Sequence, residues 1–147
     1  MKRRLTKGCP KRILIVEDDE GMSMLVAEAL GARGYRISRV HDGIEAINTI
    51  LDRKPDLVVL DLALPRLTGY DICSMVRKAD SVSKTPIVIM SGQGDVDHRL
   101  EAFAVGADDY VTKPFDTNEL VARVEAVMMR AHGKALPTPF LAEDRAA

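Results

Sequence analysis

The sequence predicts a single α/β domain built on a five-stranded parallel sheet with helices on both faces. Two features of the 147-residue chain lead to this fold class. Short apolar runs rich in Val and Ile recur along the chain, which is typical of parallel strands buried on both faces. Segments with helical periodicity separate these runs. Strands that alternate with helices favour a doubly wound sheet, for which we expect the strand order 2-1-3-4-5.

Five segments have the character of strands. Continuous apolar runs cover residues 13–16, 57–60 and 87–90. Residues 35–40 alternate between apolar and polar side chains, so we place this strand at an edge of the sheet. Residues 110–111 predict a short fifth strand. The expected strands therefore cover residues 12–16, 35–40, 56–60, 86–90 and 109–112.

Helical periods fill the intervals between the strands. Asp42-x-x-Glu45 resembles a capping box at the start of one of these helices. Apolar residues recur on one face of three helices, namely Met22, Leu25, Val26, Ala29 and Leu30, then Ile44, Ile47 and Leu51, and finally Leu120, Val121, Val124, Val127 and Met128. The expected helices cover residues 20–33, 43–53, 69–79, 95–105 and 117–132.

The composition is that of one ordinary globular domain. Hydrophobic residues make up 46% and charged residues 29%, and the net charge of -1 gives no argument for binding nucleic acid or a membrane. Residues 1–10 are basic and lack a following signal-peptide core, so we expect a flexible tail there. The domain is expected to cover residues 11–132, followed by a flexible tail over residues 133–147. No apolar run approaches the ~18 residues of a transmembrane helix.

Cysteine and histidine form no obvious ligand or disulfide pattern. The chain has two cysteines, Cys9 and Cys73, without a Cys-x-x-Cys spacing. A disulfide framework is therefore disfavoured, and a reducing, cytoplasmic location is expected. The three histidines, His41, His98 and His132, are scattered and are interpreted as surface residues.

Charged side chains follow three of the expected strands. Glu17 and Asp18 follow the first strand, Asp61 the third and Lys113 the fifth. In a sheet of this order, the carboxyl ends of the first and third strands flank the ligand-binding crevice. Two carboxylates at close range repel by about 4 kcal/mol at an effective dielectric near 20, and a divalent cation relieves this repulsion. Oxygen ligands favour Mg²⁺. The alternative for the run from Glu17 to Asp19 is that acidic residues only favour the start of a helix.

Further groups on the same rim suit a phosphoryl group. Ser91-Gly92 ends the fourth strand, where a hydroxyl could donate to a phosphoryl oxygen and glycine leaves room for close approach. Lys113 adds a cation, and Pro114 stops the ladder in a tight turn. An ordinary turn and a surface lysine remain the alternatives. Together these residues predict phosphorylation of a carboxylate, with Asp61 as the nucleophile. Because no Gly-x-x-x-x-Gly-Lys or Gly-x-Gly-x-x-Gly motif is present, we expect another protein or a small acyl phosphate as donor.

Four motifs carry a family resemblance. They are ILIVEDD at residues 13–19, DLALP at residues 61–65 with Gly69, SG at residues 91–92, and GADDYVTKPF at residues 106–115. In this order and at these spacings, they resemble a bacterial response-regulator receiver domain of the stand-alone type. The resemblance covers about residues 11–132.

The resemblance implies a flavodoxin-like fold and phosphotransfer to Asp61 from a sensor histidine kinase or a histidine phosphotransferase. It implies Mg²⁺ held by Glu17, Asp18, Asp61 and the backbone carbonyl of Ala63.

The resemblance also implies a two-state switch. Ser91, with Gly92 beside it, would move toward the phosphoryl group near Lys113, and Tyr110 would turn inward. The face made by helix four, strand five and helix five would contact an output protein, and a homodimer of the phosphorylated form is compatible with it.

Three alternative classes of function are a DNA-binding regulator, a phosphatase with an aspartate nucleophile, and a receiver scaffold. A DNA-binding regulator would need a module that residues after Leu136 cannot form, so this alternative requires the chain to be a fragment of a larger regulator with a DNA-binding or enzymatic output domain. Phosphatases with an aspartate nucleophile usually carry a second Asp two residues later, and Ala63 argues against that class. A receiver scaffold that is never phosphorylated is disfavoured by the complete acidic site. We therefore expect no enzymatic activity beyond self-phosphorylation and autodephosphorylation at Asp61.

Overall fold

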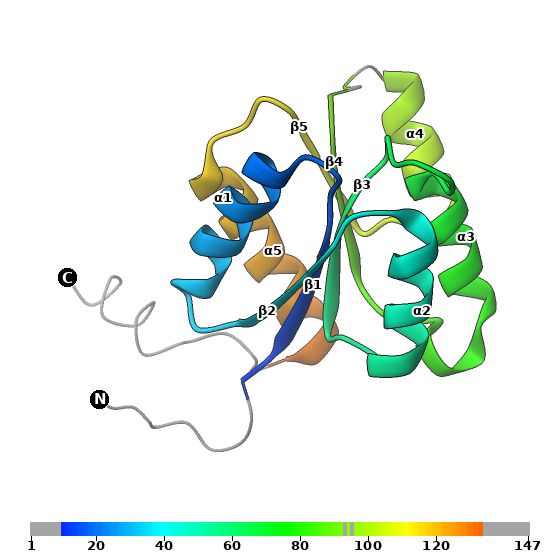
Figure 1. Ribbon diagram of the computed structural model, residues 1–147, viewed down its shortest axis with the longest axis horizontal. Coiled ribbons are helices and arrows are strands. Elements are labelled where there is room, and N and C mark those ends of the chain that lie inside the picture. The colour runs from blue at the N-terminus through cyan, green and yellow to red at the C-terminus, as the bar shows by residue number, and fades with distance from the viewer. Residues whose placement is uncertain (1–9, 93, 95, 134–147) are drawn as a thin grey trace.

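The computed structural model describes residues 10–92, 94 and 96–133, and its five strands form one parallel sheet (Figure 1). The strand order is β2-β1-β3-β4-β5, which confirms the predicted fold class and order. The edge position predicted for the second strand is also correct. The strands are β1 (Arg12–Val16), β2 (Arg36–Val40), β3 (Leu57–Asp61), β4 (Ile87–Ser91) and β5 (Asp109–Thr112).

Helices follow each strand, as expected for a doubly wound fold. The 3-10 turn η1 (Asp80–Val82) was not predicted, and the first helix ends two residues earlier than expected, at Gly31. The helices are α1 (Glu20–Gly31), α2 (Gly43–Arg53), α3 (Gly69–Lys78), α4 (Val96–Ala104) and α5 (Thr117–His132).

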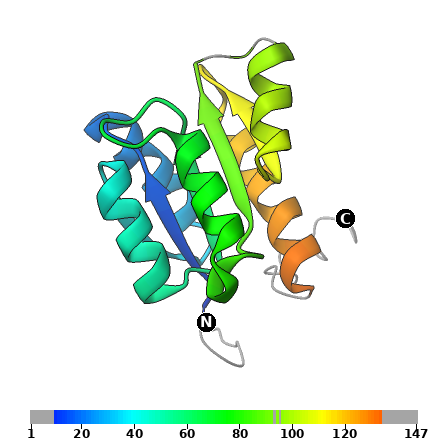
Figure 2. The ribbon, with the colours of Figure 1, turned by 90° about the vertical axis from the view of Figure 1, so that its right-hand side faces the viewer.

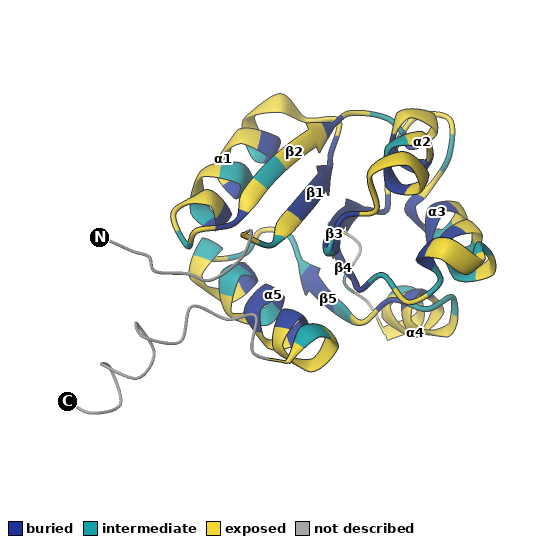
Figure 3. Ribbon diagram, turned by 90° about the horizontal axis from the view of Figure 1, so that it is seen from below, coloured by how far each residue is buried: buried dark blue, intermediate teal, exposed yellow. Residues whose placement is uncertain are grey.

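Two hydrophobic cores lie on opposite faces of the sheet. Helices α1 and α5 cover one face, and α2, α3 and α4 cover the other (Figures 1 and 2). Successive strand residues point to opposite faces. In β1, Ile13 and Ile15 join the core under α1 and α5, whereas Leu14 and Val16 join the core under α2 and α3. Figure 3 shows that the central strands are buried, which explains their continuous apolar runs.

The apolar faces of two helices differ from the sequence prediction. Leu25 of α1 is 47% exposed, and Ile44 and Leu51 of α2 are 41% and 40% exposed. In α2 the predicted Ile47 is buried, together with Ala46 and Ile50. The i, i+3, i+7 spacing therefore correctly predicted the helix and one of its three core residues. It included Ile44 and Leu51 wrongly, because the buried face of the helix is centred on Ala46, Ile47 and Ile50.

A capping box is incomplete at the start of α2 and complete at the start of α3. The side chain of Asp42 accepts a hydrogen bond from the N–H of Glu45 at 2.8 Å, as predicted. The carboxylate of Glu45 accepts from the N–H of His41 rather than from Asp42, so the predicted box is incomplete. A full capping box forms at the start of α3, between Thr68 and Asp71. There Asp occupies the position where Glu or Gln is the usual signal.

Two of the three histidines are more buried than the surface interpretation predicted, and Cys73 is buried as well. Cys73 is buried in α3, and burial raises the pKa of its thiol to about 12. His98 and His132 are half-buried, and His132 Nε2 lies 2.9 Å from the carbonyl oxygen of Asp56. The surface interpretation is correct for His41, which is exposed.

Parts of the expected organisation fall outside the described residues. The two expected tails, residues 1–10 and 133–147, do so except for Pro10 and Gly133, as does Cys9. Both tails stay predictions. Within the described part of the chain, no helix has the length and hydropathy needed to cross a membrane.

Arg77 of α3 joins three segments at the amino ends of the strands. Its guanidinium donates to the carbonyl oxygens of Ser83 at 3.1 Å and Thr85 at 2.6 Å. It also donates to the carbonyl of Gly106 at 2.6 and 3.0 Å, and to Asp108 Oδ2 at 3.0 Å. The Arg77 side chain is 24% exposed, and the residues that offer the three carbonyl oxygens are half-buried, whereas Asp108 is exposed.

Arg77→Met is expected to lower the free energy of unfolding by about 2–3 kcal/mol, because it leaves three carbonyl oxygens of half-buried residues without their donor. Urea unfolding followed by circular dichroism measures this value. Lys78→Met, which removes a neighbouring exposed cation, is expected to change it by no more than about 0.5 kcal/mol. Equal effects of the two substitutions would contradict the role assigned to Arg77.

Candidate functional site

Three carboxylates meet at the carboxyl ends of β1 and β3. One oxygen from each of Glu17, Asp18 and Asp61 lies within 4.8 Å of the other two. The register pairs Val16 with Leu60, which places the residues that follow them side by side. Glu17 and Asp61 are buried, whereas Asp18 is exposed. The cluster therefore has a buried floor and one ligand group open to solvent.

Lys113 brings an ammonium group to this cluster. Its Nζ lies 2.7 Å from Glu17 Oε1 and 3.4 Å from Asp61 Oδ2. Its backbone N–H donates to the carbonyl of Ser91 at 2.7 Å, which fixes the start of the loop after β5. The Lys113–Pro114 peptide bond is cis, and Pro114 itself is exposed. One cation thus contacts both buried carboxylates.

The charges in the cluster shift one another's protonation. Burial raises the pKa of Glu17 above its ordinary value, although the hydrogen bonds from Lys113 and from the N–H of Asp19 act in the opposite direction. Burial would lower the pKa of Lys113, but the hydrogen bond to Glu17 and the charge of Asp61 outweigh it, so the pKa is raised. The ammonium form of Lys113 is therefore firmly held at neutral pH.

The loop after β3 positions Asp61. Asp61 Oδ1 accepts a hydrogen bond from the backbone N–H of Ala63 at 3.2 Å. Gly69 begins α3 directly against this loop, and its N–H donates to the carbonyl of Leu62 at 2.9 Å. A Cβ at Gly69 would lie 2.7 Å from the carbonyl oxygen of Asp61, so glycine is required for this close approach.

Ser91 and Gly92 lie on the same rim. The register pairs Asp61 with Met90, which puts Ser91 one residue beyond the carboxylate on the neighbouring strand. Ser91 is 1% exposed, and a Cβ at Gly92 would meet nothing within 4 Å. Space therefore remains open beside the cluster at this position.

Tyr110 lies within β5 and is buried, with 2% of its surface exposed. It is therefore not the half-exposed edge aromatic that its place in the sheet would allow. The guanidinium carbon of Arg99, from α4, lies 5.7 Å from the centre of the tyrosine ring. This distance is within the range of a cation–π interaction, so the ring contacts the helix as well as the sheet.

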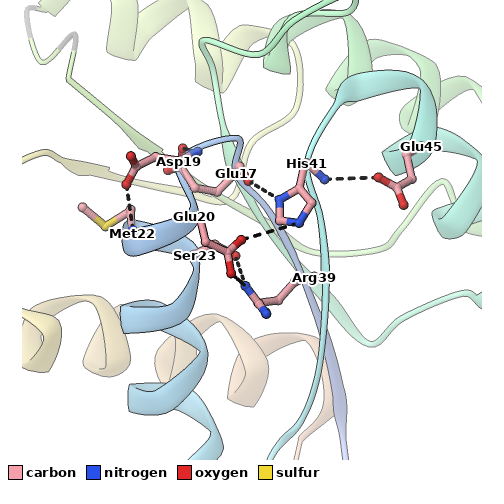
Figure 4. A network of polar contacts seen from close by, with 8 residues as sticks. All are labelled: Glu17, Asp19, Glu20, Met22, Ser23, Arg39, His41 and Glu45. Atoms are coloured by element: carbon pink, nitrogen blue, oxygen red, sulfur yellow. Dashed lines mark hydrogen bonds and ion pairs between the residues drawn. The ribbon is translucent and has the colours of Figure 1, made fainter.

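A polar network that the sequence analysis missed contacts the backbone of Glu17 (Figure 4). His41 Nδ1 lies 3.2 Å from the carbonyl oxygen of Glu17, and Nε2 lies 3.7 Å from a carboxylate oxygen of Glu20. Arg39 pairs with the same Glu20 carboxylate at 3.1 Å. The register of Val16 with Val40 places His41 beside Glu17, so correct strand pairing was the signal that could have found it.

Asp19 serves the helix rather than the cluster. Its side chain accepts a hydrogen bond from the N–H of Met22 at 2.7 Å and caps α1. Its own N–H donates to Glu17 Oε2 at 3.1 Å. The helix-start interpretation of the acidic run therefore holds for Asp19, while Glu17 and Asp18 belong to the carboxylate cluster.

The donor set fits a hard divalent cation. Three carboxylates against the one ammonium of Lys113 leave a formal charge of two negative in the cluster. Oxygen-only donors with an open side suit Mg²⁺, which retains several of its waters in protein sites. The exposed Asp18 provides that open side.

Comparison with known proteins identifies the family. The model of the response regulator receiver domain matches residues 13–125. The chain belongs to this family. Receiver domains act in two-component signalling, and the acidic triad is typical of their Mg²⁺ site. The phosphate regulon transcriptional regulatory protein PhoB of Rhizobium meliloti is 39% identical over 127 residues, which are 86% of this chain and 56% of that protein.

Solved receiver structures match the fold closely. A putative response regulator from Chloroflexus aurantiacus matches with a TM-score of 0.79 and 36% identity, over 82% of this chain and 99% of that one. The BeF3-activated receiver domain of DrrB, from Thermotoga maritima, matches with a TM-score of 0.75 and 34% identity, over 82% and 99%. The chain spans about half the length of the curated relatives it matches.

The raised pKa of Glu17 predicts a pH-dependent cost of folding. Because the folded pKa lies above the unfolded value of 4.5, the stability contributed by Glu17 is present below pH 4.5 and is lost as the pH rises through the folded pKa. In metal-free protein, the stability of wild type relative to Glu17→Gln is therefore expected to fall over this window. Urea unfolding at a series of pH values measures it. A constant difference would contradict the prediction, and Glu101→Gln, at an exposed site on α4, is the control.

Proposed function

We propose that this receiver domain accepts a phosphoryl group on Asp61 and signals through a conformational switch to a protein partner. The observation that carries the proposal is that the Asp61 carboxylate lies 3.4 Å from the Lys113 ammonium and within 4.8 Å of the carboxylates of Glu17 and Asp18. Family membership supports the same role. The proposal therefore rests on a buried nucleophile, Asp61, with the cation of Lys113 and the solvent-exposed carboxylate of Asp18 beside it.

The proposed donor is a phosphohistidine of a sensor histidine kinase or a histidine phosphotransferase. A carboxylate oxygen of Asp61 attacks the phosphorus, the P–N bond breaks, and its electron pair returns to the imidazole of the donor. Lys113 pairs with the transferred oxygens. In autodephosphorylation, water attacks the phosphorus and the bond between phosphorus and the Asp61 oxygen breaks. Inorganic phosphate is released and the free Asp61 carboxylate is restored. No other enzymatic activity is proposed.

Mg²⁺ is the proposed cofactor, held by Glu17, Asp18, Asp61 and the backbone carbonyl of Ala63. When bound, it would neutralise charge on the phosphoryl oxygens. The chain's own contribution is orientation: the N–H of Ala63 holds one oxygen of Asp61, and Lys113 lies near the other. Burial of Asp61 excludes most water from the nucleophile.

The proposed switch uses Ser91, Gly92 and Tyr110. A phosphoryl group on Asp61 would accept a hydrogen bond from the hydroxyl of Ser91, which ends the neighbouring strand, and the open space at Gly92 leaves room for it. Movement of Ser91 would then favour one position of Tyr110, the inward one described here. The phosphoryl group shifts this equilibrium only by as much as it favours one state.

The proposed signalling surface is the face of α4, β5 and α5. On α4, Val96, Leu100 and Phe103 are 68%, 61% and 43% exposed and recur at a helical spacing. Beside them, Arg123 of α5 pairs with Asp109 of β5 at 3.2 Å. An apolar stripe with a charged rim suits a protein partner, which is either an output protein or a second copy of the phosphorylated chain.

A second candidate is that the chain is the receiver portion of a longer regulator. The coverage of its curated relatives favours this candidate, since it spans about half of their length. Either way, we propose that the receiver acts in the cytoplasm, without direct contact with nucleic acid or a membrane. A stand-alone receiver and a longer regulator differ in the output they deliver, not in the chemistry at Asp61.

Incubation with acetyl phosphate and Mg²⁺ is expected to add one phosphoryl group to the chain, as measured by intact mass. Asp61→Asn is expected to abolish the gain because it removes the nucleophile. Asp80→Asn, at an exposed carboxylate in η1, is the matched control and is expected to retain it. Loss of the gain in the control alone would contradict the assignment. Absence of any gain in wild type that binds Mg²⁺ would favour a non-phosphorylated scaffold or a strict requirement for a protein donor.

Mg²⁺ is expected to raise the free energy of unfolding, by about 2.7 kcal/mol at a concentration one hundred times the dissociation constant. Asp18→Asn is expected to weaken this stabilisation because it removes the solvent-exposed ligand of the cluster. Thermal unfolding with and without Mg²⁺ measures both values. An identical Mg²⁺ response in wild type and Asp18→Asn would sink the proposed ligand set, and Asp80→Asn again serves as the control.

A further inference from the structure

A second concave site lies at the opposite end of the sheet from Asp61. The cavity has a volume of about 210 Å³ and lies between α2 and the edge of the sheet formed by β1 and β2. Figure 3 views the molecule from this end and shows β2 beside β1, with α2 across from them. Arg12 and Arg36 begin their strands and Arg53 ends α2, so all three arginines of the cavity lie at the amino ends of the strands.

One of the three arginines has a structural role. Arg12 donates to the carbonyl oxygens of Arg53 at 2.8 Å and Lys54 at 2.6 Å, where it caps the last turn of α2. Its Nε also lies 4.0 Å from Asp56 Oδ2, and its backbone N–H donates to the same oxygen. The carboxylate of Asp56 is thereby already engaged with Arg12.

The other two arginines have no such explanation. Within the described residues, the guanidinium groups of Arg36 and Arg53 make no hydrogen bond or ion pair, and both residues are exposed. They face one cavity from opposite walls, β2 and α2. Two unpaired guanidinium groups on one cavity provide the fork geometry that binds phosphate oxygens in pairs.

The remaining lining has both polar and apolar character. Ser38 and Thr49 line the cavity from the same two walls and carry hydroxyl groups, and Leu14 and Pro55 line it with apolar side chains. Leu14 and Pro55 are buried, so the cavity has a small apolar floor beneath its charged rim. The side chain of Ile37 packs against the core on the other face of the sheet. A bare inorganic anion would leave that floor uncovered.

We propose that this cavity binds a small organic phosphate, with the phosphate group on Arg36 and Arg53 and the organic part on the apolar floor. The hydroxyl groups of Ser38 and Thr49 are within the same cavity and supply neutral donors. A charged rim, neutral donors and an apolar floor are the usual elements of a small-molecule site. The inference is independent of phosphorylation at Asp61, because the two sites lie at opposite ends of the strands.

The test is an NMR titration of the full chain labelled with ¹⁵N. The probes are adenosine 5′-monophosphate, adenosine and inorganic phosphate. The monophosphate is expected to shift amides of β2 and the last turns of α2 saturably and to bind more tightly than either other probe. Arg36→Gln and Arg53→Gln are each expected to weaken it about tenfold, because each removes a charge-assisted pair. Arg130→Gln, at an exposed position on α5, makes the same change in net charge elsewhere and is expected to have no effect.

Several results would overturn the inference. They are the absence of saturable shifts in the cavity, shifts that survive in the variant carrying both Arg36→Gln and Arg53→Gln, and equal affinity for inorganic phosphate. Shifts produced only by a polyglutamate peptide would overturn it in favour of a protein-docking surface. Because Arg36 and Arg53 have no partners to lose, both variants are expected to fold, and acetyl phosphate labelling of Asp61 checks that they do.

Discussion

The ion pair between Lys113 and Glu17 is the interaction on which the functional site depends. Glu17 is 1% exposed, and a buried carboxylate is unfavourable without a charged or hydrogen-bonding partner. Lys113 follows β5 and Glu17 follows β1, and β3 and β4 lie between these strands, so the lysine side chain spans the rim of the sheet. The same ammonium group lies 3.4 Å from Asp61 Oδ2, so the ion pair also sets the position of a cation beside Asp61.

The charge balance of the cluster explains how chemistry at Asp61 would reach a distant surface. Among the residues that the structure describes, Lys113 is the cation that contacts both buried carboxylates, so a phosphoryl group on Asp61 would change its partners. Its backbone is tied to Ser91 by the 2.7 Å hydrogen bond, and it lies three residues after Tyr110 in the same chain segment. In the proposed switch, a shift at Lys113 would therefore pass along β5 toward α4, whose exposed apolar residues form part of the proposed signalling surface.

The sequence predicts those features that follow from burial and topology. Strands β1, β3 and β4 are buried on both faces, which demands continuous apolar runs, and the parallel order then brings Glu17, Asp61 and Lys113 to one rim. Contacts that depend on strand register or on distant loops produce no local pattern in the sequence. His41 meets the Glu17 carbonyl because of strand pairing, and Arg77 meets Gly106 across 29 positions of the chain. The apolar face of α2 was assigned correctly only in part, because Ile44 and Leu51 lie outside the buried face of Ala46, Ile47 and Ile50.

The same edge strand connects the two ends of the sheet. Strand β2 begins at Arg36, in the basic cavity, and His41, at its far end, contacts the backbone of Glu17. Five strand residues span about 17 Å, which exceeds the Debye length of about 8 Å at physiological salt. Direct electrostatic coupling between an anion at Arg36 and the carboxylate cluster is therefore weak. Any coupling must be mechanical, and it must pass through a displacement of β2 that moves His41. Because β2, like β5, is paired on one side only, it can shift with less disruption of its ladder than the three central strands.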